Sequence, residues 1–168
     1  MGARLAVDVG TVRIGVAVSD ARRVIAVPLD TVRRATDGSD LRALAALAAE
    51  REVDDVVVGL PISLSGREGP AAASVRAFTQ TLADALDPLP VLLVDERLST
   101  TAAHQALHAS GRPGRQHRTV VDRTAAAILL QTVLDAANGG GAGPVRSGEH
   151  VLGELVPPSG GQADRSKA

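Results

Sequence analysis

The sequence predicts an α/β domain built on a mixed five-stranded sheet, an antiparallel meander plus two parallel strands, with helices on its faces. Three Val- and Ile-rich stretches near the N-terminus are separated by only a few residues, and connections this short join antiparallel strands. Further on, continuous apolar runs alternate with stretches of helical periodicity, which is typical of parallel strands covered on both faces.

The first half of the chain supplies the meander and one helix. Strands are expected at 5–9, 14–19 and 24–32, because these stretches are rich in β-branched residues and are bounded by turn-forming residues. Ser39 is a suitable N-cap for a helix at 40–51, where leucines recur at the helical period.

Strands and helices alternate in the second half. Pro70 suits the first position of a helix, and Ser99 or Thr100 suits the cap of a later one. Right-handed crossovers leave the first strand central, with the two later strands parallel to it on one side. The expected elements are a strand at 53–59, a loop at 60–69, a helix at 70–86, a strand at 91–94, a helix to about 109 and a last helix from about 119 to 137.

The composition changes near residue 139. Residues 1–138 are expected to form one folded domain, whereas 139–168 are rich in Gly and Pro and are expected to be a disordered tail. Deleting such a tail should leave the melting temperature nearly unchanged.

The overall composition excludes several classes of protein. A net charge of −1 gives no global attraction to nucleic acid, and the absence of cysteine excludes disulfides and thiolate metal sites. Phe78 is the only aromatic residue, so a nucleic acid would be held through its phosphates and shape rather than by base stacking. No signal-peptide pattern and no apolar run near the ~18 residues of a membrane span occur, which predicts a cytoplasmic protein without a membrane partner.

Three acidic residues lie far apart in the chain, each where the predicted sheet would bring it to one edge. Asp8 ends the first apolar run, Glu96 follows the run at 91–94, and Asp122 begins the last helical stretch. Carboxylates without cysteine favour hard divalent cations and phosphate chemistry, so we expect two ions of Mg²⁺ or Mn²⁺ at these residues. Taken singly, each acid also suits a turn, a solvated surface or a helix dipole.

Polar and basic residues near these acids are candidates for binding a phosphate backbone. Gly10 permits close backbone approach or simply a turn, and Thr11 donates to a phosphate or closes that turn. Arg13 and Arg97 suit phosphate contacts or the orientation of a neighbouring carboxylate. An Arg-rich loop is expected at 112–118, with a solvated loop as its alternative. The substrate-binding candidates are Gly10, Thr11, Arg13, Arg97, Arg112, Arg115 and Arg118.

Four motifs occur in order: DVGTVRIG at 8–15, GLP at 59–61, DERLST at 95–100 and VDRTAA at 121–126. Together they resemble the YqgF/RuvX family of bacterial ribonuclease H-like proteins, and the resemblance covers about residues 3–137. It implies a ribonuclease H-like sheet, with Asp8, Glu96 and Asp122 as the catalytic and metal-binding acids. The chain departs from the family at Val9, where an aromatic residue is common, and in a basic loop of Arg and His rather than Lys.

The resemblance implies a divalent-metal-dependent endonuclease that hydrolyses phosphodiester bonds of a structured nucleic acid and leaves a 5′-phosphate. We expect 5′-end processing of pre-16S rRNA in ribosome biogenesis. A Holliday junction resolvase in DNA recombination and repair is the alternative, and it would act on branched DNA as a dimer. A non-catalytic nucleic-acid-binding module is a further alternative, although clustered acids would disfavour it. We expect a monomer or weak homodimer.

Overall fold

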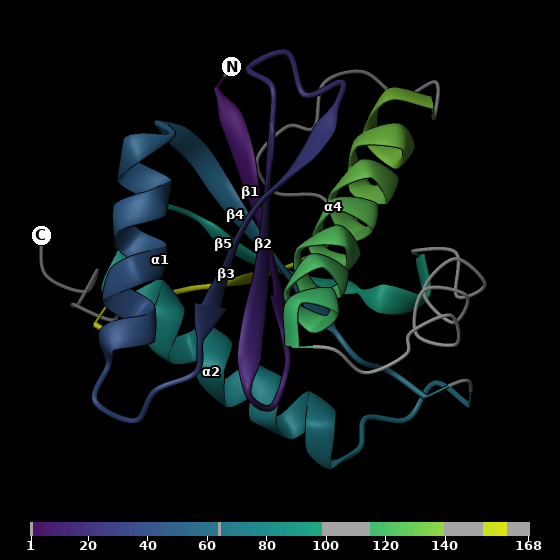
Figure 1. The fold of residues 1–168 in the computed structure, drawn as a ribbon. Helices are drawn as coiled ribbons and strands as arrows, with labels where there is room; N and C mark the ends of the chain where they lie inside the picture. The colour runs from purple at the N-terminus through teal and green to yellow at the C-terminus, as the bar shows by residue number, and fades with distance from the viewer. Residues whose placement is uncertain (1, 64, 99–114, 140–152, 161–168) are drawn as a thin grey trace, which may run out of the picture.

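The computed structural model describes residues 2–63, 65–98, 115–139 and 153–160, which form a six-stranded sheet in the order β3-β2-β1-β4-β5-β6 (Figure 1). β1 (Ala3–Val9), β2 (Arg13–Ser19) and β3 (Ala26–Arg33) make the antiparallel meander. β4 (Val53–Leu60) and β5 (Val91–Asp95) run parallel to β1 on its other side. The predicted mixed sheet is therefore confirmed, with β1 near its centre.

The sixth strand, β6 (Glu154–Val156), lies inside the segment for which the sequence predicts a disordered tail. It pairs antiparallel with the edge of β5 and buries Val156. Three residues are too few to show the alternation of a strand, and the neighbouring Gly and Pro residues are typical of a loop or tail. The sequence therefore predicts five strands, one fewer than the structure has. Three side chains of one helix hold this segment, through the contacts Arg76–Glu154, Gln80–Pro157 and Asp84–Ser159.

Helices cover both faces of the sheet (Figure 1). α1 (Ser39–Glu50) and α2 (Pro70–Leu86) pack on one face, and α4 (Arg115–Gly139) packs on the other. Along β1, Leu5 and Val7 belong to the core beneath α1 and α2, whereas Ala6 belongs to the core beneath α4. Since successive side chains of a strand alternate between faces, the even positions of β1 face α4.

Several helix boundaries differ from those predicted. Gly38, with a φ of 76°, precedes α1, so Ser39 is its first residue and provides no side-chain cap. α4 begins at Arg115, and residues 115–118 are therefore helical rather than part of a loop. α2 has the predicted bounds. The helix expected up to residue 109 lies outside the described residues. A short 3-10 helix, η1 (Glu96–Leu98), follows β5.

Within the described segments, no helix is long and apolar enough to cross a membrane.

Candidate active site

Strand alternation brings Asp8 and Glu96 to the same face at the same edge of the sheet. β1 and β5 lie on either side of β4, and all three strands are parallel. Asp8 follows Ala6 by two positions, and Glu96 follows Val94 by two; Ala6 and Val94 both belong to the core beneath α4. Both carboxylates therefore lie at the carboxyl ends of parallel strands on the α4 side.

Gly59 of β4, the strand between them, provides the space for Glu96. A Cβ atom at Gly59 would lie 2.7 Å from Oε1 of Glu96 and 3.0 Å from Cδ2 of Leu129 in α4. The carboxyl group of Glu96 therefore lies directly over the backbone of β4, on the sheet face that α4 covers. Asp8 lies on the same face, on the neighbouring strand β1.

The environment of Glu96 raises its pKa to about 7 from an ordinary value of 4.5. Burial is the largest cause, and the negative charges of Asp8 and Asp95 follow. A hydrogen bond between the side chains of Glu96 and Asp8 also favours the protonated form. As the pH falls below about 7 the pair therefore takes up a proton, because two adjacent anions in a half-buried site repel each other.

Asp122 approaches the same edge from α4. A Cβ atom at Gly15 would lie 2.0 Å from the backbone carbonyl oxygen of Asp122, so the helix rests directly on β2 at this point. Gly15 is the register partner of Asp8. The Asp122 carboxylate itself accepts a hydrogen bond from Nε of Arg13, at 2.7 Å from Oδ2, and both side chains are half-buried.

The structure thus brings two of the three predicted acids into direct contact and pairs the third with an arginine. In the part of the chain that the structure describes, no group of three His, Cys, Asp or Glu side chains is close enough together to hold a metal ion. Oxygen ligands from Asp8 and Glu96 alone fit a hard divalent cation, which would replace the proton that the two carboxyl groups share.

Arg13 and Arg97 both contact carboxylates. Of the two roles expected for them, phosphate contact and orientation of a neighbouring carboxylate, the structure shows the second. Arg97 pairs with Asp95, with 2.6 Å between Nη2 and Oδ2, and these hydrogen bonds lower the pKa of Asp95. Asp95 and Glu96 therefore have different partners, as expected for adjacent residues at a strand end.

The remaining predicted residues have varied outcomes. Gly10 closes a tight turn by donating from its backbone N–H to the carbonyl of Arg13, at 2.9 Å, and a Cβ there would lie 2.6 Å from the same oxygen. Thr11 lines a cleft on the opposite face of the sheet. Arg112 lies outside the described residues, and for Arg115 and Arg118 the structure describes only the helical backbone.

Gly15 and Gly59 contribute to the geometry of the candidate site and were not among the residues predicted for it. Both lie inside strands, where a glycine signals close approach of another group, and both belong to the motifs at 8–15 and 59–61. That signal was available in the sequence.

Comparison with known proteins agrees with this architecture. A family model described as "RuvX: Holliday junction resolvase" matches residues 2–136. A protein from Streptomyces coelicolor named "Putative pre-16S rRNA nuclease" is 49% identical over 151 residues, 90% of each chain. Proteins of the same name from Nocardioides sp. and Clavibacter michiganensis are 50% identical over 147 residues and 45% identical over 166 residues. The former alignment covers 85% of this chain and 94% of the relative, and the latter 98% of each.

Among solved structures, T. thermophilus RuvC in complex with a Holliday junction substrate has a TM-score of 0.50 to this chain. The match covers 86% of this chain and 100% of the RuvC chain, at 15% sequence identity. At that identity the likeness concerns the fold alone, and it confirms the predicted ribonuclease H-like class.

Proposed function

The chain belongs to the RuvX (YqgF) family of Holliday junction resolvases, and on that premise we propose that it is a divalent-metal-dependent endonuclease that processes the 5′ end of pre-16S rRNA. The observation that carries the proposal is the contact between Asp8 and Glu96 at the carboxyl ends of parallel strands. The two carboxyl groups are half-buried and one has a strongly raised pKa, and perturbed pKa values of this kind cluster at functional sites.

Asp8, Glu96 and Asp122 are the residues that would hold the metal, in one or two sites. Bound there, Mg²⁺ or Mn²⁺ would activate the attacking water and neutralise charge on the scissile phosphate. Glu96 would have to be deprotonated to hold a cation, so cation binding would be stronger as the pH rises through about 7. Arg13, the first residue of β2, holds the Asp122 carboxylate.

The names of the relatives favour RNA as the substrate. The three relatives described above carry the name of a pre-16S rRNA nuclease and are 45% to 50% identical to this chain. In this role the protein would work in the cytoplasm, on a ribosomal precursor, as a monomer.

Cleavage of four-way DNA junctions is the second candidate, because the family model is described as a Holliday junction resolvase. Resolution requires two symmetric cuts and therefore a dimer. A non-catalytic binding module fits less well, since a site for phosphates gains nothing from two buried carboxylates.

The catalytic site is tested by Asp8→Asn, with Asp30→Asn on the exposed part of β3 as the matched control. We expect Asp8→Asn to abolish cleavage while the protein stays folded and still binds nucleic acid, and Asp30→Asn to cleave normally. Unchanged cleavage by purified Asp8→Asn would refute the site.

The substrate is tested by giving the protein, with Mg²⁺, a 5′-extended 16S rRNA fragment and a four-way DNA junction in parallel. Cleavage of the RNA at the mature 5′ end is the expected result. Symmetric cutting of the junction with the RNA left intact would favour the resolvase. Depletion in cells should then lead to accumulation of 5′-extended 16S precursor.

A further inference from the structure

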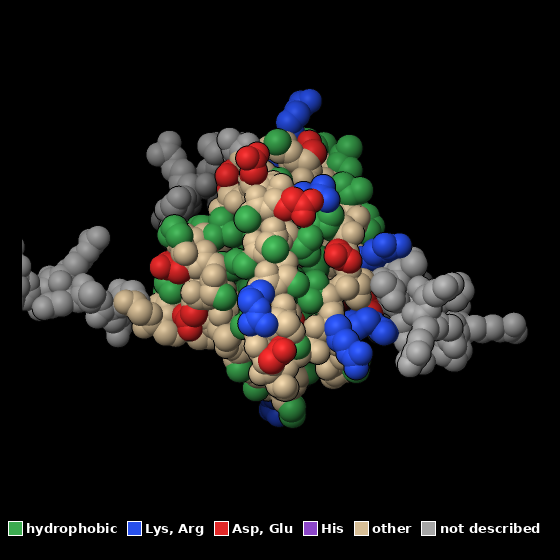
Figure 2. Space-filling view, turned by 60° about the vertical axis from the view of Figure 1, so that its left-hand side comes forward, with side chains coloured by type: hydrophobic (Ala, Val, Ile, Leu, Met, Phe, Trp, Pro, Cys, Tyr) green, Lys and Arg blue, Asp and Glu red, His purple; other side chains and the backbone are tan. Residues whose placement is uncertain are grey.

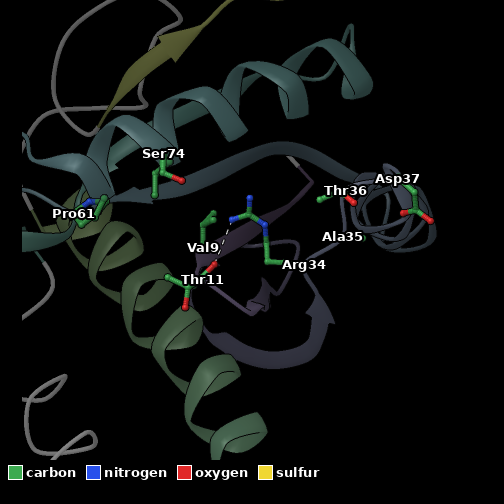
Figure 3. A pocket seen from close by; sticks show the side chains of 11 residues that line it. Val9, Thr11, Arg34, Ala35, Thr36, Asp37, Pro61 and Ser74 are labelled. Carbon is green, nitrogen blue, oxygen red and sulfur yellow. Dashed lines mark hydrogen bonds between the residues drawn. The ribbon is translucent and has the colours of Figure 1, made fainter.

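A cleft of about 740 Å³, lined by both polar and apolar residues, lies on the other side of the sheet edge that carries Asp8 (Figure 3). Val9 lines it, whereas its neighbour Asp8 faces α4, so one strand end separates the cleft from the acidic pair. Its volume is within the range of about 300–1,000 Å³ that is usual for small-molecule sites. Its polar lining includes Thr11 after β1, Arg34 and Thr36 after β3, and Ser74 in the second turn of α2.

Arg34 lies within this cleft and is fixed from three directions. Its guanidinium lies 4.7 Å from the centroid of the Phe78 ring, its Nη1 donates to the carbonyl of Gly10 at 3.3 Å, and its Nε is 3.7 Å from the buried carboxylate of Asp40. Figure 3 shows the guanidinium reaching toward Val9 and Thr11, with a dashed line for its hydrogen bond to the Gly10 carbonyl. A planar guanidinium that is already held in place suits a phosphate, because little side-chain entropy is lost on binding.

The acidic residue of the lining, Asp37, is turned to its own loop. Its carboxylate accepts hydrogen bonds from the Ser39 side chain and, at 3.0 Å, from the backbone N–H of Ser39. These bonds, with the charge of Arg42, lower the pKa of Asp37. The charge of Asp37 is therefore held within its own loop, and Arg34 is the basic residue in the described lining of the cleft.

Adjacent arginines place positive charge on both faces of this edge. Val32 belongs to the core beneath α1 and α2, so Arg33 faces α4, where it is the register partner of Arg13, and Arg34 faces the cleft. Basic side chains also gather in the lower part of the face in Figure 2, the end at which β1 finishes in Figure 1.

We propose that the cleft binds a nucleotide of the substrate strand next to the cleavage position, with its phosphate on Arg34 and the hydroxyls of Thr11, Thr36 and Ser74. The strand would pass from the Asp8–Glu96 pair over the turn at 10–12, between Arg33 on one face and Arg34 on the other. The proposal rests on the proposed function, because the nucleic-acid strand held in the cleft is the one that would be cut at Asp8 and Glu96. Such a site fixes the register of the strand without reading its sequence, as phosphate contacts do.

The test blocks the cleft with negative charge and measures binding rather than cleavage. Ser74→Glu puts a carboxylate in the cleft, whereas Ser74→Gln has the same size without charge, and Ala73→Glu puts the charge one residue away, outside the lining. Thr36→Glu is a second variant, on the β3–α1 side of the cleft. All are made in the Asp8→Asn protein, and fluorescence anisotropy reports the Kd for a fluorescein-labelled single-stranded RNA of about 12 nucleotides.

Ser74→Glu and Thr36→Glu should each raise the Kd about tenfold, which equals about 1.4 kcal/mol, and Ser74→Gln and Ala73→Glu should leave it within about twofold. An unchanged Kd for both cleft variants, or an equal loss in Ala73→Glu, would overturn the proposal. So would binding of adenosine monophosphate that Ser74→Glu abolishes while RNA binding is unaffected, since the cleft would then serve a free nucleotide. Because no cleavage is measured, the result is independent of whether Asp8 is catalytic.

Discussion

At neutral pH the carboxyl groups of Asp8 and Glu96 lie too close together for both to be charged without loss of stability. Glu96 has a pKa of about 7 because it is buried and lies beside Asp8, while Asp95, one residue earlier, has its pKa lowered by Arg97. Neighbouring acids with pKa values shifted in opposite directions are typical of sites in which the two acids have different roles.

A pH dependence of stability follows for the protein without divalent cations. The pKa of Glu96 is higher in the folded state than its ordinary value of 4.5, so the folded protein binds this proton more tightly. The resulting stabilisation is present below about pH 4.5 and is lost as the pH rises through about 7. The free energy of unfolding, from urea titrations at about pH 5 and pH 8, should therefore fall relative to that of Glu96→Gln as the pH rises.

Asp95→Asn is the second variant for that measurement. The negative charge of Asp95 is one of the causes that raise the pKa of Glu96, so its removal should bring that pKa closer to the ordinary value. Between about pH 5 and pH 8 the fall relative to Glu96→Gln should therefore be smaller in Asp95→Asn than in the wild type. Parallel curves for the wild type and Glu96→Gln would contradict the shared proton.

At the scale of elements, two glycines allow α4 and η1 to reach the sheet. Gly15 of β2 is in contact with the backbone of α4, and Gly59 of β4 lies beneath the Glu96 side chain at the start of η1. Gly15 lies on β2, next to the strand that carries Asp8, and Gly59 lies on β4, next to the strand that precedes Glu96. The strand pairing therefore sets the distances between the acidic side chains.

Gly15→Ala should destabilise the protein by at least about 2–3 kcal/mol, the usual cost of overpacking. The added Cβ would lie 2.0 Å from the carbonyl oxygen of Asp122, which belongs to helix backbone and cannot move independently. Urea unfolding gives the free energy. Gly69→Ala is the control, because nothing lies within 4 Å of its Cβ position and its φ of −102° suits alanine. Equal costs for the two substitutions would contradict the close packing of α4 on β2.

The sequence predicts the elements better than it predicts their contacts. Strand order and the carboxyl-end position of Asp8 and Glu96 follow from periodicity and connection length, and both are confirmed. The pairing of Arg13 with Asp122 does not follow, since it depends on how closely α4 lies on β2 and on side-chain reach. Alternation within a strand is local information, whereas the distance between a helix and a sheet depends on the whole interface.

At the scale of the whole molecule, β6 changes the expected role of the C-terminal segment. It covers the edge of β5, the strand that leads to Glu96, and its ends are tied to α2. An uncovered strand edge is also prone to pair with other chains.

Truncation before Gly153 should therefore lower the melting temperature by several degrees relative to truncation after Gly160, which keeps β6. A loss of about 1–3 kcal/mol corresponds to roughly 2–4 °C per kcal/mol in a chain of this size. Differential scanning calorimetry of both truncated proteins measures the difference. Identical melting temperatures would support the sequence-based expectation of a tail that adds no stability.

Asp8 and Glu96 are proposed to form a catalytic pair that depends on a divalent cation. The most direct measurement is the rate of cleavage of an end-labelled 5′-extended 16S rRNA fragment as Mg²⁺ is titrated, for the wild type, Glu96→Gln and Asp95→Asn. We predict saturable Mg²⁺-dependent cleavage by the wild type and Asp95→Asn, and a loss of at least about a hundredfold in Glu96→Gln, the lower range for removing a group that acts in the transition state. Cleavage by Glu96→Gln at the wild-type rate, or by the wild type in EDTA, would contradict the account.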